Sequence, residues 1–446
     1  MLPDLFVLPL RYNKYKTMID NMKRLILSLL MVFICTLYIC AQIRGKEISV
    51  MVTPDRDNWT YKTGETATFT IQVYKAQCLL KGAVIDYEQG EEMYPEVTKN
   101  NVTLKDGKLV LRGKLSKPGF YRVKVTAKVN GRNYDGMATV AYSPENIKPC
   151  AEMPSDFDAF WTNSLKEARN TPLEPTMVLL PERCTEKVNV YQVSFHNIRW
   201  GSRTYGILCV PKAEGKYPAL LRVPGAGIRP YYGDVQTAEK GAITLEIGIH
   251  GIPVTYTQDY YDKLFKGALY NYWESNSDDR DAFYYKRVFV GAVRAVDFIC
   301  SLPQFNGKQL GVSGSSQGGM LSFVTAALDS RVTFYAVVHP AMCDHTASLK
   351  KQPCGWPHYF YGKKADDKKV TVSRYYDGIN FVRRIKVPGW FSFGYNDDVV
   401  APTSMYAAYN TVSAPKEFKP YLQTGHYWYQ EQYDEWNEWM WKQMDL

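Results

Sequence analysis

The feature that most constrains this chain is a serine between two glycines, in the run Gly314-Ser315-Ser316-Gln317-Gly318. Residues 309–313 before it have the pattern of a short buried strand, and residues 320–328 after it that of an apolar helix face. A strand, a G-x-S-x-G turn and a helix make a nucleophile elbow, whose strained backbone needs glycines where chains pass closely. An ordinary Gly/Ser turn is the alternative, but the flanking elements favour Ser316 as a catalytic nucleophile.

From about residue 150 onward, strand-like segments alternate with segments of helical periodicity. Strands are expected at residues 190–195, 205–210, 219–223, 242–247, 309–313, 334–338, 389–393 and 417–422. Helices are expected from a Ser155 cap to about Asn170, over 289–302, and from Tyr429 to the C-terminus. This alternation predicts an α/β fold with a doubly wound sheet and functional residues at the strand ends.

A nucleophilic serine needs a base, and in this arrangement the chain order is serine, acid, histidine. The six histidines are at positions 196, 250, 339, 345, 358 and 426. Two of them precede Ser316, and His339 follows too soon to leave room for an acid. His345 and His358 lie in a Lys-rich segment without a strand end. His426 follows a predicted strand in a short Thr-Gly-His loop, so it is the predicted base.

The acid is expected at the end of the strand that precedes this histidine. Asp397 and Asp398 occupy that place, directly after the predicted strand 389–393. A carboxylate there would hold the imidazole in one tautomer and stabilise the imidazolium that forms when the serine loses its proton. Asp397 is preferred, and Asp398 is the alternative. An Asp pair could also cap the helix that begins near Pro402, a role open to Asp398.

Residues 47–142 have a different hydrophobic pattern, in which apolar residues recur with a period of two. Ala67, Phe69, Ile71 and Val73 alternate with polar residues, and turn signals such as Asn130-Gly131 separate such runs. Several short strands at this spacing predict a β-sandwich resembling an immunoglobulin-like domain over residues 47–145. It contains no histidine, so we expect a spacer or packing partner, with sugar binding through Trp59 or Tyr94 as the alternative.

The N-terminus has the pattern of a secretory leader. Lys23-Arg24 precede the uncharged run 25–39, and Ala41 supplies a small residue for cleavage. This predicts a signal peptide from about Met22 within a leader of residues 1–41, and therefore export to the periplasm or outside the cell. An uncleaved membrane anchor is the competing interpretation, because the apolar run is long for a leader and short for a span.

The net charge and the number of cysteines limit which binding partners and disulfide bonds can be expected. The net charge is +9; residues 1–41 hold five Lys/Arg and two Asp, so the rest carries 9 − 3 = +6 without a basic run. This does not suggest nucleic-acid binding, and no stable membrane insertion is expected once the leader is cleaved. Seven cysteines remain beyond residue 41. Cys343 and Cys354 could pair, although isolated thiols fit as well. The sequence leaves the oligomeric state open, a homo-oligomer included.

Several motifs in residues 150–446 resemble the acetyl xylan esterase and cephalosporin C deacetylase family. They are Phe157-Asp158-Ala159-Phe160-Trp161, the run 281–288, Ala292-Val293-Arg294-Ala295-Val296, Gly314-Ser315-Ser316-Gln317-Gly318-Gly319, the run 397–402, Ala407-Ala408-Tyr409-Asn410 and Gly425-His426. The resemblance implies an α/β-hydrolase that removes acetyl groups from sugars or oligosaccharides through Ser316, Asp397 and His426, with no metal or other cofactor.

Two segments depart from the family pattern. Where the family has His-Gly-Tyr in the loop that supplies the second oxyanion donor, this chain has Pro224-Gly225-Ala226. The donor there is a backbone N–H, so Ala226 can serve alongside the Gln317 N–H. Residues 249–279 are rich in aromatic residues and are expected to form a cap over the site. The added N-terminal β region is also unusual for the family.

The sequence is compatible with three hypotheses about function. An exported serine esterase acting on acetylated carbohydrate is the leading hypothesis. A peptidase or acyl-thioesterase of the α/β-hydrolase superfamily is the second, although the serine at the elbow argues against the usual thioesterase arrangement. A non-catalytic carbohydrate-binding protein with a relic hydrolase domain is the third, and the complete set of Ser316, Asp397 and His426 argues against it.

Overall fold

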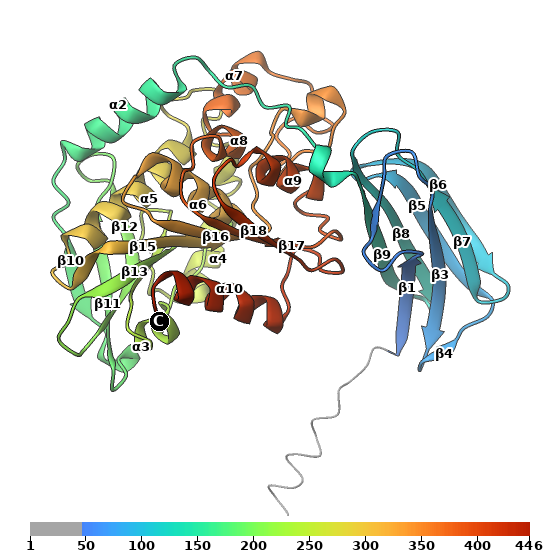
Figure 1. Cartoon of the computed structure of the whole chain (residues 1–446), viewed down its shortest axis with the longest axis horizontal. Helices are drawn as coiled ribbons and strands as arrows, with labels where there is room; N and C mark the ends of the chain where they lie inside the picture. Colours follow the sequence, from blue (N-terminus) through green and yellow to red (C-terminus); the bar gives the residue numbers. More distant parts are fainter. Residues whose placement is uncertain (1–46) are drawn as a thin grey trace, which may run out of the picture. The chain divides into compact units, whose positions relative to one another are not determined.

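The computed structural model describes residues 47–446 (Figure 1). The predicted leader, residues 1–41, lies outside the described residues. Within the described part, no helix combines the length and the apolar character needed to cross a bilayer. Residues 50–73 and 79–446 form one compact unit, which holds most of the N-terminal β region and all the residues of the candidate site.

The N-terminal region consists of two β-sheets. One sheet contains β1 (Ile48–Pro54), β3 (Ala67–Lys75), β4 (Cys78–Leu79) and β7 (Lys108–Gly113). The other has the order β2 (Thr60–Tyr61), β9 (Arg132–Tyr142), β8 (Gly119–Val129), β5 (Ala83–Glu91) and β6 (Tyr94–Leu104). The predicted period of two is confirmed in β3, whose residues 67, 69, 71 and 73 are buried while the residues between them are partly exposed.

Aromatic side chains join the two sheets into one core. Phe69 of β3 and Tyr121 of β8 stack with ring centroids 6.0 Å apart, and both are buried. Gly113 of β7 makes room for this packing, since a Cβ there would lie 2.3 Å from the Tyr121 ring. Trp59, one of the two residues considered for sugar binding, is only 9% exposed and therefore offers no open stacking face.

The rest of the chain forms a nine-stranded mixed sheet in the order β10-β11-β12-β14-β13-β15-β16-β17-β18. The strands are β10 (Thr176–Leu179), β11 (Val188–His196), β12 (Arg203–Pro211), β13 (Tyr217–Arg222), β14 (Ile243–Gly248), β15 (Phe305–Ser315), β16 (Phe334–Val338), β17 (Gly389–Phe393) and β18 (Lys416–Pro420). The pairs from β10 to β14 are antiparallel, and those from β14 through β13 to β18 are parallel.

Helices cover both faces of this sheet, as the alternation of elements predicted. The helices are α2 (Phe157–Arg169), α3 (Val235–Glu239), α4 (Gln258–Lys266), α5 (Tyr284–Ser301), α6 (Gln317–Leu328), α7 (Asp367–Tyr375), α8 (Gly378–Val382), α9 (Pro402–Thr411) and α10 (Gln430–Gln443). Figure 1 shows α3 and α10 on one face and α5, α6 and α8 on the other. Because neighbouring strands β15 to β18 are parallel, their carboxyl ends meet at one edge.

The structure corrects the expectation for the first helix. Ser155 does not cap it: α2 begins at Phe157 with Asp156 at the N-cap, and no side chain accepts a bond there. The Asp156 carboxylate instead binds the Arg280 guanidinium and the Tyr375 hydroxyl. The residue at the start of this helix is therefore held by long-range contacts that a local capping pattern does not contain.

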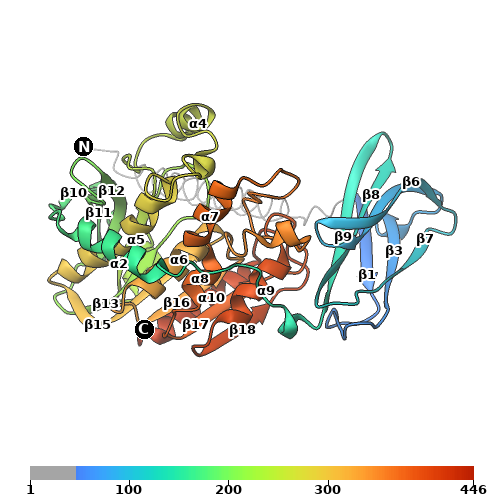
Figure 2. The same ribbon diagram turned by 90° about the horizontal axis from the view of Figure 1, so that it is seen from above.

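Several elements were not expected, among them strand β10 and helices α3, α4, α7 and α8. The edge strand β10 was missed because all four of its residues are exposed, so the strand shows no apolar alternation. Helix α4 lies within the segment predicted to cap the site, and Figure 2 shows it standing apart from the strands. The seven cysteines in the described residues are all free thiols, Cys343 and Cys354 included.

Candidate active site

Ser316 lies at a strained turn between β15 and α6. Its φ is +59°, a conformation that side-chain-bearing residues adopt at a cost of about 1–3 kcal/mol. The Ser316 N–H donates to the Val338 carbonyl at 3.0 Å, and the Ser316 carbonyl accepts from the Ala341 N–H at 3.0 Å. The end of the neighbouring strand β16 and the residues just after it therefore bond to both the N–H and the carbonyl of Ser316.

The two glycines of the elbow are sterically required. A Cβ on Gly314 would lie 2.5 Å from the Val223 carbonyl oxygen, and one on Gly318 would lie 2.4 Å from the same atom. No real Cβ approaches a backbone oxygen so closely, and backbone cannot move aside as a flexible side chain does. The turn after β13, which carries Val223, therefore packs against both glycines. This is the close passage of backbones that the G-x-S-x-G pattern predicted.

The structure brings Ser316, Asp397 and His426 together from the ends of three strands. His426 Nε2 lies 3.0 Å from Ser316 Oγ, and His426 Nδ1 lies 2.8 Å from Asp397 Oδ2. Asp397 is fully buried, whereas the His426 side chain is 23% exposed. The serine, imidazole and carboxylate thus form one continuous line of hydrogen bonds, whose imidazole is partly exposed and whose carboxylate is buried.

The carboxylate of this line is Asp397 and not its neighbour. Asp397 Oδ1 accepts from the N–H groups of Val399 and Val400 at 2.9 and 2.8 Å, which orients Oδ2 toward His426. The Asp398 side chain is 47% exposed and pairs with Lys124 at 3.3 Å. Asp398 does not cap the following helix either, because the N-cap of α9 is Ala401 and no side chain bonds to that end.

Two backbone N–H groups next to Ser316 are free to bind an anion. In residues 47–446 neither the Ala226 N–H nor the Gln317 N–H donates a hydrogen bond. Gln317 is the first residue of α6, where an N–H has no partner within its own helix. Gly225 places the Ala226 loop against the elbow, since a Cβ there would lie 3.8 Å from the Ser316 Cβ. These are the two positions that the sequence suggested as oxyanion donors.

The Gln317 side chain connects the elbow to this loop and to the cap segment. Its Nε2 donates to the Pro224 carbonyl at 3.3 Å, while its Oε1 accepts from the hydroxyls of Tyr272 and Tyr285 at 2.8 and 2.7 Å. The Tyr272 hydroxyl also accepts from the Gly227 N–H at 3.3 Å. Because all these groups are buried or half-buried, the amide and the two phenols fix the shape of the oxyanion loop.

His250 supports the same loop from the end of β14. Its Nε2–H donates to the Gly227 carbonyl at 3.0 Å, and its Nδ1 accepts from the Tyr284 hydroxyl at 2.7 Å. Burial lowers the pKa of His250 to about 4, so the imidazole is neutral at ordinary pH. A neutral ring can both donate and accept, which is what these two partners require.

Only part of the predicted cap touches the elbow. Tyr272, in the 3₁₀ turn η3 (Tyr272–Glu274), is 2% exposed and contacts Gln317. Trp273 in the same turn packs against Trp356 with ring centroids 5.5 Å apart. The remaining aromatic residues of this segment with large exposed surfaces are Tyr256, Tyr260, Phe265 and Tyr270. In the described residues, Tyr272 of this turn bonds to the Gln317 side chain next to Ser316, whereas these four aromatic residues are largely exposed.

His339, which the sequence excluded as the base, lies directly against His426, the predicted base. Its ring centroid is 4.3 Å from that of His426, and its Nε2 shares a 2.7 Å hydrogen bond with Ser315 Oγ. Trp428 stacks nearby at 5.8 Å. Burial, with the nearby His426 imidazole, lowers the pKa of His339 to about 3. The ring therefore stays neutral and puts no second positive charge beside His426 when that imidazole is protonated.

His339, Asp397 and His426 are also residue types that bind metals. Their potential ligand atoms lie within 4.8 Å of one another. The Asp397 carboxylate and the His426 Nδ1 are, however, already bonded to each other, and His339 Nε2 is bonded to Ser315. A metal would have to break these bonds, including the one that orients the base. The hydrogen-bond pattern fits a nucleophilic serine site better than a metal site.

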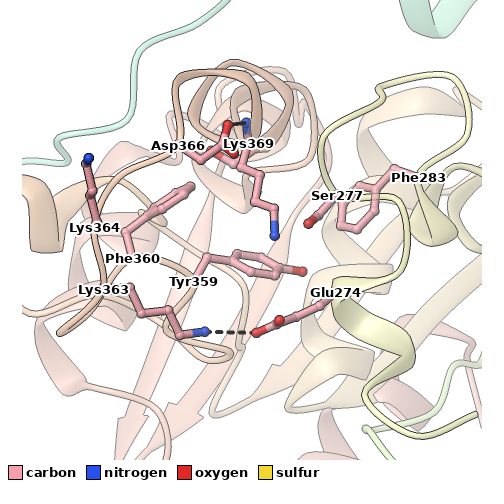
Figure 3. A pocket seen from close by; sticks show the side chains of 10 residues that line it. Glu274, Ser277, Phe283, Tyr359, Phe360, Lys363, Lys364, Asp366 and Lys369 are labelled. Atoms are coloured by element: carbon pink, nitrogen blue, oxygen red, sulfur yellow. Dashed lines mark hydrogen bonds and ion pairs between the residues drawn. The ribbon is translucent and has the colours of Figure 1, made fainter.

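A cavity of about 290 Å³ lies on another side of turn η3 (Figure 3). It is lined by Glu274, Ser277, Phe283, Tyr359, Phe360, Lys363, Lys364, Asp366, Lys369 and Ser373. Figure 3 shows the Lys363–Glu274 ion pair, 2.9 Å, and the Lys369 side chain extending toward Tyr359. Since none of Ser316, Asp397 and His426 lines this cavity, it is separate from the hydrogen-bonded line of these three residues.

Sequence reasoning missed the residues that support the site from a distance. Tyr285 lies in the run 281–288, and Tyr272 and His250 lie in the segment 249–279, but nothing local gave these residues or His339 a supporting role, because each acts through a contact with a residue far along the chain. The position of His250 and His339 directly after strands β14 and β16 was the available signal. Functional side chains collect at carboxyl ends of strands in such sheets, whether or not they react.

We predict that His339→Gln makes stability less sensitive to acid. The folded-state pKa of His339, about 3, lies below the ordinary value of 6.5, so its contribution is present above about pH 6.5 and is lost as the pH falls toward 3. One such group changes the free energy of unfolding by at most about 1.4 kcal/mol per pH unit. Urea unfolding at pH 6.5 and 4.5 should show a loss that is smaller in the variant by about 2 kcal/mol.

The other buried histidines do not obscure this comparison. His250 and His345 also have pKa values lowered to about 4, but both are present in the parent and in the variant. Their contributions cancel when the two pH dependences are subtracted. An equal acid-induced loss in the two proteins would contradict the assignment of a buried, neutral His339.

Relatives of known activity share most of this chain. Acetyl esterase Axe7A of Xylanibacter ruminicola is 38% identical over 377 residues, which cover 82% of this chain and 84% of that protein. The solved acetyl xylan esterase from Paenibacillus sp. R4 superposes with a TM-score of 0.58 at 25% identity, covering 67% of this chain and 97% of that one.

A second solved structure supports the fold. Acetyl xylan esterase 1 from Thermoanaerobacterium sp. JW/SL YS485 superposes with a TM-score of 0.59 at 23% identity, over 67% of this chain and 97% of that one. The family model described as acetyl xylan esterase (AXE1) matches residues 141–444, which contain every residue of the candidate site described above. The chain therefore belongs to the acetyl xylan esterase (AXE1) family.

Proposed function

We propose that this protein is a serine esterase that removes acetyl groups from carbohydrate through an acetyl-enzyme on Ser316. The observation that carries the proposal is the line Ser316 Oγ–His426 Nε2 and His426 Nδ1–Asp397 Oδ2, with two unbonded N–H groups beside the serine. A nucleophile, a base, an orienting carboxylate and oxyanion donors are what acyl transfer requires.

In the first half-reaction, Ser316 Oγ attacks the acetyl carbonyl carbon as His426 Nε2 takes the hydroxyl proton. The Ala226 and Gln317 N–H groups receive the negative charge that develops on the carbonyl oxygen. Collapse of this tetrahedral intermediate breaks the bond to the sugar oxygen, which leaves with the proton from His426. Buried Asp397 holds the imidazole so that Nε2 faces the serine, and it stabilises the imidazolium.

In the second half-reaction, water replaces the sugar. His426 Nε2 takes a proton from the water, whose oxygen attacks the acetyl-enzyme carbonyl. The bond to Ser316 Oγ then breaks, the serine regains its proton from His426, and acetate leaves. The neutral His339 ring beside His426 avoids a like charge during both protonated stages.

The substrate class follows from relatives and from the surface near the base. The relatives named above are an acetyl esterase and two acetyl xylan esterases. Tyr427, Trp428 and Tyr429, directly after His426, are 50%, 43% and 41% exposed. Exposed aromatic faces stack readily on the apolar faces of sugar rings, so acetylated sugars or oligosaccharides are the proposed substrates.

We also propose a division of the chain into segments and a location for the protein. We divide the chain into a leader over residues 1–41, an immunoglobulin-like β domain over 47–145 and a hydrolase domain over 150–446, with two packed β-sheets as support for the second. We propose export to the periplasm or outside the cell on the basis of the basic and apolar pattern of residues 23–41.

The proposed function is tested by acetate release from acetylated xylan and acetylated monosaccharides. The parent should release acetate, and Ser316→Ala should not do so above the small rate that binding and the oxyanion hole sustain. A fluorophosphonate probe should label the parent and not the variant. Full acetate release by a folded Ser316→Ala protein would exclude the mechanism, and labelling without release from any acetylated sugar would indicate another acyl substrate, such as a peptide or thioester.

Replacing the orienting acid tests the geometry of the line. Asp397→Asn should lower kcat by about 10⁴, because the amide stabilises the wrong imidazole tautomer and no imidazolium. Asp398→Asn is the matched control, since its carboxylate is exposed and makes no contact with His426. Steady-state rates on an acetyl ester should separate the two. A loss in Asp398→Asn with normal turnover by Asp397→Asn would reverse the assignment.

A further inference from the structure

An arginine from the N-terminal β region forms hydrogen bonds to the loop that carries Asp397. This acid loop, residues 394–401, joins β17 to α9. Arg122 of β8 donates from Nη2 to the Asp397 carbonyl at 2.6 Å and to the Tyr395 carbonyl at 3.3 Å. Its Nε donates to Thr139 Oγ1 at 2.8 Å. Arg122 and the acid loop lie in the same compact unit of the chain.

A buried carboxylate, Glu92, contacts both Arg122 and the first turn of the helix that follows the acid loop. Glu92 Oε2 lies 3.7 Å from Arg122 Nη2, and the two side chains are 0% and 12% exposed. The other oxygen, Glu92 Oε1, accepts from the Thr403 N–H at 2.8 Å, in the first turn of α9. Burial raises the pKa of Glu92 to about 7. Arg122 holds the middle of the acid loop, and Glu92 holds the helix end that follows it.

Apolar packing surrounds these polar contacts. Phe120, also from β8, lies edge-on to Tyr395 with ring centroids 4.9 Å apart, and it packs against Tyr406 of α9 at 5.5 Å. All three side chains are buried. The Arg122 side chain is only 12% exposed, and a charged donor bonds more strongly to a carbonyl when water competes little.

We propose that Arg122 is a positioning residue for the esterase reaction, so that the N-terminal β region forms part of the support of the active site. By fixing the Asp397 carbonyl, Arg122 limits rotation of the backbone on which the carboxylate is mounted. The Oδ2 atom then stays on His426 Nδ1, with Oδ1 held by the Val399 and Val400 N–H groups. This inference rests on the proposed function, because it assigns Asp397 its role there.

The position of Arg122 distinguishes it from its neighbours on the same strand. Lys124 pairs with the exposed Asp398 side chain, and Lys128 pairs with Asp86 at 2.8 Å with both groups substantially exposed. Neither lysine bonds to the backbone of the acid loop. Arg122 reaches the two carbonyls that flank Asn396, so its effect should appear in catalysis and not only in stability.

The test compares full-length Arg122→Met and Arg122→Lys enzymes with Lys128→Met as the control. Methionine keeps the length of the side chain but removes the donors, and lysine restores one charged donor. Arg122→Met should lower kcat about ten- to a hundredfold with KM nearly unchanged, because a displaced catalytic group reduces turnover without removing a substrate contact. Arg122→Lys should recover part of the loss, and Lys128→Met should keep the parental kcat.

A double-mutant cycle separates positioning from general destabilisation. If Arg122 acts through Asp397, adding Arg122→Met to Asp397→Asn should lower kcat by much less than it does in the parent. A loss of the same factor in both backgrounds would overturn the proposal. So would a full kcat in a folded Arg122→Met enzyme, with folding checked by thermal melting.

Removing the arginine leaves Glu92 as a buried, unpaired carboxylate, which can itself destabilise the protein. If Arg122→Met does not fold, the double variant Arg122→Met/Glu92→Gln removes both charges and keeps an acceptor for Thr403, and its kcat decides the question. Activity of Ser316→Ala in the same assay distinguishes the two hypotheses. An active Ser316→Ala refutes the proposed function, whereas an inactive one beside a fully active, folded Arg122 variant refutes only the positioning role.

Discussion

The candidate site depends on the close packing of three backbone segments around Ser316. The Val223 carbonyl oxygen lies too close for a Cβ on either Gly314 or Gly318, and Val338 at the end of β16 and Ala341 after it bond to the N–H and the carbonyl of Ser316. These contacts hold a serine at φ +59°, which is unfavourable on its own. The strained turn places Oγ opposite His426 and leaves the Gln317 N–H unbonded. The proposed nucleophile, its contact with His426 and one proposed oxyanion donor therefore share one steric cause.

Around this turn, the polar groups are arranged in supporting pairs. The Gln317 amide and the Tyr272 and Tyr285 hydroxyls form hydrogen bonds that fix the loop of residues 224–227. The neutral His250 ring donates a hydrogen bond to the Gly227 carbonyl of the same loop. Neutral His339 lies against the base. Burial lowers the pKa of both supporting histidines, so their rings organise the site without adding charge. The reacting imidazole is the partly exposed one, where a substrate can reach it.

The elements that could be predicted from the sequence are those whose physical cause is local. The elbow follows from glycine spacing, the sheet from alternating buried strands, and the choice of His426 and Asp397 from chain order at strand ends. The predicted Ser155 cap was wrong because the helix begins at Phe157 with Asp156 at its N-cap, and the Asp156 carboxylate binds Arg280 and Tyr375 instead of the helix end. Strand β10 escaped notice because it buries no residue. His339 and Arg122 could not be assigned, since their partners lie 24 and 275 positions away in the chain.

The most direct test of this account is a crystal structure of the enzyme after reaction with a small fluorophosphonate. The account predicts a phosphorus–oxygen bond at Ser316, with the phosphoryl oxygen within about 3 Å of both the Ala226 and the Gln317 nitrogen atoms. His426 should remain bonded to Asp397. Attachment at another residue, or a phosphoryl oxygen directed away from the Ala226 loop, would contradict the central claim that one strained turn supplies both nucleophile and oxyanion site.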